Sequence, residues 1–213
     1  MNFSRVSYPV ALAGCAASLV MMLAACGSDS DTPATSASST SASWADEVLP
    51  SPVASTPAAA SACPTAAPAN GGTPEWTLPG TTGSVAVTGS TDAVAPSVNV
   101  EAPFSVTETQ VHTLQPGDGP VVADTASVSV CYMGVNGRDG TVFDNSYERG
   151  EPVEFPLDGV VPGFQKAIAG QKVGSTVAVA MVPADGYPEG QPAAGIEPGD
   201  SLVFAIKILG ASG

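Results

Sequence analysis

Residues 27–84 consist largely of Ala, Ser, Thr and Pro, and large apolar side chains are sparse among them. No apolar period of 2 or 3.6 residues is sustained through this stretch. Such a segment cannot bury enough apolar surface to offset the conformational entropy that folding removes. We therefore predict a low-complexity, flexible tether over residues 26–91, with Trp44 and Trp76 solvated within it, and one folded domain over residues 92–213.

The boundary of that domain is marked by two short valine patches, Val85-Ala86-Val87 and Val98-Asn99-Val100. Pro96 and Pro103 interrupt the segment that contains them, and proline is confined to edges and ends of sheets. The patches therefore indicate either edge additions to the domain or its lead-in.

The first 25 residues have the features of a secretory signal peptide: Arg5 near the start, an apolar run from Val10 to Leu23, and small residues at the end. The run is too short to cross a bilayer comfortably. Leu23-Ala24-Ala25-Cys26 resembles the lipobox of bacterial lipoproteins, in which the cysteine is lipidated and becomes the new N-terminus. We expect an extracytoplasmic protein anchored to the cell membrane through Cys26; the alternative is an ordinary cleavage site beside an incidental cysteine.

The charge balance, 6 Lys+Arg against 20 Asp+Glu for a net charge of -14, argues against a nucleic-acid partner because phosphates would be repelled. The cysteines at 15, 26, 63 and 131 match neither a zinc site nor a compact disulfide framework. Cys63 and Cys131 could form a disulfide in an oxidising compartment. However, Cys63 lies in the flexible tether and Cys131 is expected to be an exposed strand thiol, so we expect both to stay unpaired. We expect no metal and no cofactor.

Strand patterns occupy much of the remaining chain, over residues 106–114, 127–133, 141–144, 176–182 and 201–209. In the second of these, Val128, Val130 and Tyr132 alternate with polar or small residues, which predicts that Tyr132 faces the core and Cys131 faces away from it. These segments indicate a curved antiparallel sheet.

One short helix is expected to begin at Pro162, which suits a first-turn position. Phe164, Ala167 and Ile168 then fall on one face, and Gly170 can end the helix in a left-handed conformation. We expect this helix to lie across the concave face of the sheet and to leave an apolar gap at one end.

Seven sequence blocks between Val111 and Leu209 resemble, in order, those of the FKBP-type peptidyl-prolyl cis-trans isomerases. The blocks are Gln115-Pro116-Gly117-Asp118-Gly119, Val130-Cys131-Tyr132-Met133-Gly134, Asp139-Gly140-Thr141-Val142-Phe143-Asp144-Asn145-Ser146, Val160-Val161-Pro162-Gly163-Phe164, Gly174, Pro183 with Gly186-Tyr187, and Leu202-Val203-Phe204. The resemblance implies an α+β fold in which a five- to six-stranded antiparallel half-barrel wraps around one short helix.

The resemblance also implies a proline pocket with two groups of residues. The catalytic group is Tyr132, Phe143, Asp144, Phe164 and Tyr187, with Phe164 as the floor and Asp144 and Tyr187 at the rim. The substrate-binding group is Val153, Val160, Val161, Ile196 and Phe204, with the Ile196 backbone N–H as a donor to a substrate carbonyl.

This sequence departs from the family pattern at four positions. Phe164 stands where Trp is most frequent, Val153 where a bulkier aromatic is common, Pro188 where Gly is usual, and Glu197 where Pro is usual. The last two changes affect the loop from Tyr187 to Asp200, so the rim contacts transfer less directly than the walls.

The function implied is a prolyl isomerase, or rotamase, that helps exported proteins fold by binding the twisted X-Pro amide in an apolar aromatic pocket. Its partners would be proline-containing polypeptide clients and a macrolide inhibitor, and we expect a monomer. The alternative is a non-catalytic peptide- or partner-binding module on the same fold. In that module the altered loop from Tyr187 to Asp200 would hold a partner or peptide without useful catalysis. Separately, each site residue has a structural alternative: the aromatic residues as core side chains, Asp144 as a turn cap or a surface ion pair with Arg149, and Tyr187 as a loop residue.

Overall fold

The computed structural model describes residues 62–68 and 73–213. The predicted signal peptide, Cys26, Trp44 and most of the predicted tether lie outside the described residues. Within the described part of the chain, no helix is long and apolar enough to cross a membrane.

The main sheet has six strands, all paired antiparallel, in the order β4-β8-β9-β5-β6, with β7 also paired to β5. The strands are β4 Gln110–Gln115, β5 Ser127–Asn136, β6 Val142–Asn145, β7 Val153–Pro156, β8 Thr176–Met181 and β9 Leu202–Ser212. The helices are α1 Ser146–Arg149 and α2 Pro162–Ile168, and short 3-10 turns cover Leu157–Gly159, Pro183–Asp185 and Pro192–Ala194. The predicted antiparallel sheet is therefore confirmed, and the one-turn helix α1 is an addition to the single short helix that the sequence predicts.

The helix α2 forms where the sequence predicts it. Pro162 is in its first turn, Phe164, Ala167 and Ile168 are buried, and Gly170 follows with φ 78°. Its buried face packs into a core that includes Val177, Val179 and Met181 of β8 and Phe204, Ile206 and Ile208 of β9. Tyr132 and Phe143 pack against the same core.

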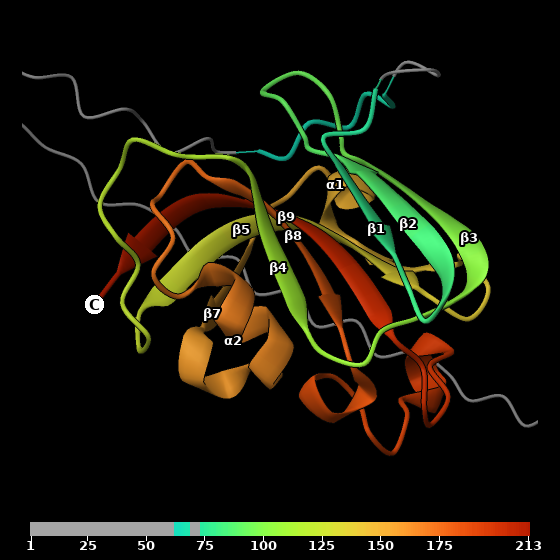
Figure 1. The fold of residues 1–213 in the computed structure, drawn as a ribbon. Coiled ribbons are helices and arrows are strands. Elements are labelled where there is room, and N and C mark those ends of the chain that lie inside the picture. Colours follow the sequence, from blue (N-terminus) through green and yellow to red (C-terminus); the bar gives the residue numbers. More distant parts are fainter. Residues whose placement is uncertain (1–61, 69–72) are drawn as a thin grey trace, which may run out of the picture. The chain divides into compact units, whose positions relative to one another are not determined.

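The opposite face of the main sheet is also covered, by a separate three-stranded sheet in the order β1-β2-β3 (Figure 1). Its strands are β1 Trp76–Pro79, β2 Thr82–Thr88 and β3 Ser97–Ser105. Val85, Val87 and Phe104 form a second core with Ala178 and Ala180 of β8 and Val203 and Ala205 of β9. Because both faces are covered, every residue of β8 is buried.

The prediction of a solvated tether is therefore wrong for residues 76–88, which form β1 and β2. The Val85-Ala86-Val87 alternation is too short to identify a strand from sequence alone, and its partner surface lies about 90 residues further along the chain. Trp76 is also not a solvated linker residue, because its ring stacks on His112 of β4 with centroids 5.6 Å apart and 4° between the planes.

A disulfide joins Cys63 to Cys131 of β5, across 68 residues of sequence. Both cysteines are buried, in a cluster with Ala95, Tyr147 and Leu209. The Cys63 N–H also donates to the Gly150 carbonyl at 3.0 Å.

The expectation that these cysteines stay unpaired, with Cys131 as an exposed thiol, is wrong. Cys131 does point away from the α2 core, as the alternation predicts, but the segment around Cys63 and the helix α1 cover that side of β5. The folded part of the chain therefore includes residues well before position 92.

Candidate active site

A cavity of about 370 Å³ opens between the start of α2 and the strands β5, β6, β7 and β9. It is lined by Tyr132, Phe143, Asp144, Phe155, Gly159, Val160, Val161, Phe164, Tyr187 and Phe204. Eight of the ten residues predicted for the site are thus brought together. They come from several segments of the chain, and the first and last of them, Tyr132 and Phe204, are 72 positions apart.

The aromatic rings of the cavity pack mostly edge to face. Phe164 lies 5.7 Å from Tyr132, 5.3 Å from Phe155 and 5.3 Å from Phe204, measured between ring centroids. Phe143 contacts Phe204 in the same way at 5.5 Å. Such pairs favour defined ring orientations, so the cavity has a rigid apolar wall. Phe164 is only 5% exposed, as expected of a floor.

The approach of two of these rings depends on Gly134 of β5. A Cβ at that position would lie 2.7 Å from a Phe143 ring carbon and 2.8 Å from a Phe204 ring carbon. Both distances are shorter than carbon–carbon contact allows. Glycine at 134 therefore lets the rings meet over the strand.

The polar edge of the cavity is a network of three side chains. The Tyr132 hydroxyl donates to Asp144 Oδ2, and Arg149 Nη1 of α1 donates to Asp144 Oδ1 at 2.8 Å. Burial, together with the neighbouring Asp144 carboxylate, raises the pKa of Tyr132 to about 12. Burial opposes ionisation of Asp144, but the hydrogen bonds from Tyr132 and Arg149 outweigh it and hold the pKa of that carboxyl below its ordinary value.

Asp144 is therefore an anion at neutral pH, with a hydrogen bond to each of its oxygens. A carboxylate engaged in this way is poorly suited to remove a proton from a substrate. The helix α1 is capped instead by Asn145, whose side chain accepts from the Tyr147 N–H at 3.1 Å. The site thus combines apolar walls with a fixed negative charge at one edge.

Two predicted site residues do not contribute to the cavity. Val153 does not line it; Phe155, two residues further along β7, does. The two side chains share one face of a short strand, so the sequence alone did not determine which of them reaches the cavity. The sequence signal for Phe155 was its size, because it is the larger apolar residue of the pair.

Ile196 is the second exception. Its side chain is buried and its backbone N–H donates to the Gln191 carbonyl at 3.1 Å, so this N–H is already engaged in the structure. The following residue, Glu197, donates its own N–H to Asp200 Oδ2 at 2.9 Å, a bond that proline could not make.

Asp200 also accepts from Asn136 Nδ2 at 2.7 Å, and it forms an ion pair with Arg138 at 3.2 Å. Asp200 therefore anchors the unusual rim loop to the end of β5.

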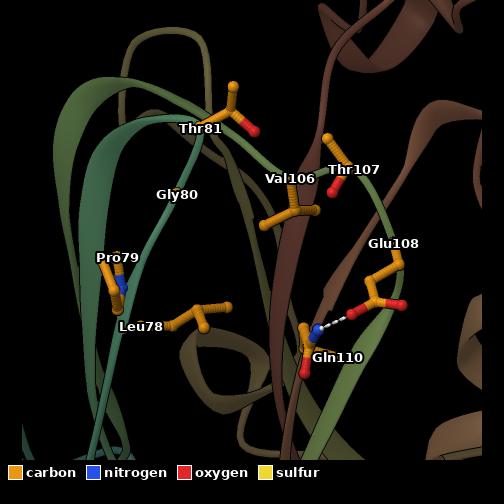
Figure 2. A pocket seen from close by; sticks show the side chains of 8 residues that line it. All are labelled: Leu78, Pro79, Gly80, Thr81, Val106, Thr107, Glu108 and Gln110. Carbon is orange, nitrogen blue, oxygen red and sulfur yellow. Dashed lines mark hydrogen bonds between the residues drawn. The ribbon is translucent and has the colours of Figure 1, made fainter.

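A second cavity, of about 250 Å³, lies between the turn that follows β1 and the connection from β3 to β4 (Figure 2). It is lined by Leu78, Pro79, Gly80, Thr81, Val106, Thr107, Glu108 and Gln110, and Gln110 Nε2 donates to Glu108 Oε1 at 2.8 Å. No aromatic side chain lines it, so it offers no flat apolar surface for a ring. The aromatic cavity is the stronger candidate for the functional site.

Comparison of this chain with known proteins identifies the class to which this fold and cavity belong. Residues 119–209 match the family described as FKBP-type peptidyl-prolyl cis-trans isomerase. The chain is 37% identical over 98 residues to a probable FK506-binding protein of Corynebacterium glutamicum, and the match covers 45% of this chain and 80% of that protein. The chain therefore belongs to the FKBP-type peptidyl-prolyl cis-trans isomerase family.

Other relatives match the same part of the chain. The FKBP-type 22 kDa peptidyl-prolyl cis-trans isomerase of Escherichia coli is 40% identical over 100 residues, covering 47% of this chain and 48% of that protein. The chain thus matches about half the length of that relative. A crystal structure of a peptidyl-prolyl cis-trans isomerase from Pseudomonas syringae aligns with a TM-score of 0.45 and 30% identity, covering 49% of this chain and 76% of that one.

Proposed function

We propose that this protein catalyses cis-trans isomerisation of X-Pro peptide bonds in polypeptides. The observation that carries the proposal is the aromatic cavity of about 370 Å³, which is walled by packed rings and has a single charged edge formed by Asp144. A proline ring is apolar and compact, so it suits an apolar cavity with Phe164 at the base.

The chemistry requires no nucleophile or general base. Rotation about an amide C–N bond has a barrier of about 18–20 kcal/mol because the planar state is stabilised by resonance. The twisted transition state has lost this conjugation, so its carbonyl carries less charge separation and depends less on water than the planar ground state does. A dry site that binds the twisted form more tightly than the planar form therefore lowers the barrier.

The roles of Asp144 and Tyr187 are tested by two substitutions that keep side-chain shape. In Asp144→Asn the charge at the edge of the cavity is lost, while an oxygen remains to accept from Tyr132. We expect kcat/KM for a proline-containing peptide to fall about tenfold, which corresponds to about 1.4 kcal/mol of transition-state stabilisation. Tyr187→Phe should produce a smaller loss. Melting temperatures should change little, because both residues lie at the rim of the cavity.

The measurement is a protease-coupled isomerase assay on purified protein with its disulfide intact. Glu148→Gln serves as the matched control, because Glu148 is an exposed carboxylate of α1 next to Arg149, and its side chain makes no hydrogen bond to any residue that the structure describes. Full activity in both rim variants would remove Asp144 and Tyr187 from the mechanism. A folded wild-type protein without activity would favour the non-catalytic peptide-binding module instead.

We also propose that the protein is lipid-anchored outside the cytoplasm through Cys26 and acts on exported proteins. The buried Cys63–Cys131 disulfide supports an oxidising location, because such bonds persist mainly in exported proteins. The signal-like start of the chain and the lipobox-like sequence ending at Cys26 point the same way.

Cys26→Ser is expected to give an unprocessed precursor or protein released from the membrane, because the residue that would carry the acyl chains is gone. Fractionation of cells followed by immunoblotting measures the change. Cys15→Ser, within the predicted signal peptide, is the matched control and should leave membrane association intact. Wild-type processing and fractionation of the Cys26→Ser variant would refute the lipid anchor.

A further inference from the structure

The connection between β3 and β4 makes a polar contact with the loop that carries Tyr187. Thr109 Oγ1 donates to Asp185 Oδ2 at 2.5 Å, and the Val182 N–H donates to the same Thr109 oxygen at 3.3 Å. Thr109 precedes the residues that match the family, which begin at residue 119. Thr109 lies directly before β4, at the end of the connection from the three-stranded sheet.

Asp185 also accepts a bond from the helix that forms the floor of the cavity. Lys166 Nζ of α2 lies 2.7 Å from Asp185 Oδ2, and the Asp185 side chain is only 18% exposed. The bonds from Lys166 and Thr109 hold the pKa of Asp185 below its ordinary value, so the group is an anion at neutral pH. One carboxylate oxygen thus joins α2, the β3–β4 connection and the 3-10 turn Pro183–Asp185.

The sequence positions of these groups connect the network to the cavity. Lys166 is two residues after Phe164, the floor, and Asp185 is two residues before Tyr187, at the rim. The ion pair between Lys166 and Asp185 therefore joins the segment that carries the floor to the segment that carries the rim.

Among the described residues, the turn Pro183–Asp185 makes few other hydrogen bonds. The Asp185 N–H donates to the Val182 carbonyl at 3.0 Å and the Gly186 N–H to the Pro183 carbonyl at 3.1 Å, but both bonds are internal to the turn. Within residues 62–68 and 73–213, the side-chain hydrogen bonds that join this turn to other elements are those of Thr109 and Lys166. Of the two, Lys166 is 56% exposed and its ion pair is weakened by solvent.

We propose that Thr109 is a positioning residue for Tyr187: its hydroxyl fixes the turn Pro183–Asp185 and thereby sets the rim of the cavity relative to Phe164. Its effect on catalysis rests on the proposed isomerase function. The connection from the three-stranded sheet to β4 therefore helps to shape the site.

The test compares Thr109→Val, which keeps the side-chain shape and removes the hydroxyl, with Thr109→Ser, which keeps the hydroxyl. Hydrogen exchange of the amides of residues 183–190 is the first readout and does not depend on activity. We expect exchange there to become about threefold to tenfold faster in Thr109→Val, as for the loss of one hydrogen bond of ordinary net strength, and Thr109→Ser to restore the wild-type rate. The matched control is Thr107→Val, because Thr107 is exposed on the same connection (Figure 2) and should have no effect.

The second readout is kcat/KM for a proline-containing peptide, which should fall about threefold to tenfold in Thr109→Val and recover in Thr109→Ser. In a Tyr187→Ala background, Thr109→Val should cause no further loss, because its target is already removed. An unchanged exchange rate in Thr109→Val, the same rate increase in Thr109→Ser, or an undiminished kcat/KM in an active protein would each overturn the proposal. If the wild-type protein is inactive, the proposed function fails, and the exchange data alone decide whether Thr109 holds the turn.

Discussion

Replacing Cys63 and Cys131 together with serine is expected to lower the free energy of unfolding by about 4 kcal/mol. The disulfide closes a loop of 68 residues, and a cross-link of that span removes much of the entropy of the unfolded chain. The loss should be visible as a lower midpoint in urea-induced unfolding of the double variant. A solvated, unpaired Cys63 would instead predict no change.

Reduction provides the control for this experiment. Wild-type protein unfolded in the presence of a strong thiol reductant should reach the same midpoint as the double variant, since both lack the cross-link. The double variant itself should not respond to the reductant. If oxidised wild type and the double variant unfold at the same urea concentration, the disulfide does not stabilise the fold.

The disulfide also lies directly behind the polar edge of the cavity. Cys131 precedes Tyr132 on β5, and the Cys63 N–H bonds to the Gly150 carbonyl, next to Arg149. Ser146 Oγ, which accepts from the Tyr132 N–H at 2.8 Å, lies 3.6 Å from Cys63 Sγ. We therefore expect hydrogen exchange in α1 to accelerate in the double variant.

Phe164→Ala is expected to have the second large effect, a loss of about 3–5 kcal/mol of stability together with loss of the proposed isomerase activity. The ring is nearly buried and contacts three other aromatic rings, so its removal leaves a space that the surrounding rings cannot fill completely. The same ring forms the base of the cavity, so substrate binding should weaken as well.

A matched control separates stability from function. Ile168→Ala removes a fully buried side chain from the same helix and the same core, but Ile168 does not line the cavity. We expect it to lose about 2–5 kcal/mol of stability while keeping its kcat/KM, measured below the melting transition of each variant. If Phe164→Ala retains as much activity per folded molecule as Ile168→Ala, Phe164 is a core residue without a special role in the site.

The sequence predicted the elements whose signal is local. The alternation of Val128, Val130 and Tyr132 indicates a strand with one face toward a core, and Pro162, Phe164 and Ile168 mark a short helix. The motif blocks in family order then predicted most of the residues that line the cavity, because side chains at equivalent positions of the same fold lie around the same cavity. Eight of the ten predicted residues line it.

The second sheet, the disulfide and the choice of Phe155 over Val153 were decided only by tertiary structure. A faint signal for the second sheet was present in Ala178, Ala180 and Ala205, which are apolar on the face that alternation assigns to solvent. What no local pattern specifies is the partner. The contacts of Val85 with β8 and of Cys63 with Cys131 join segments that lie far apart in the sequence, and they form because the face of the sheet opposite α2 would otherwise leave apolar surface in water. The composition of residues 76–88 predicts a tether because the segment holds few large apolar residues. Whether such a segment folds depends on the apolar surface elsewhere in the protein against which those few residues can pack, here the face of the main sheet opposite α2.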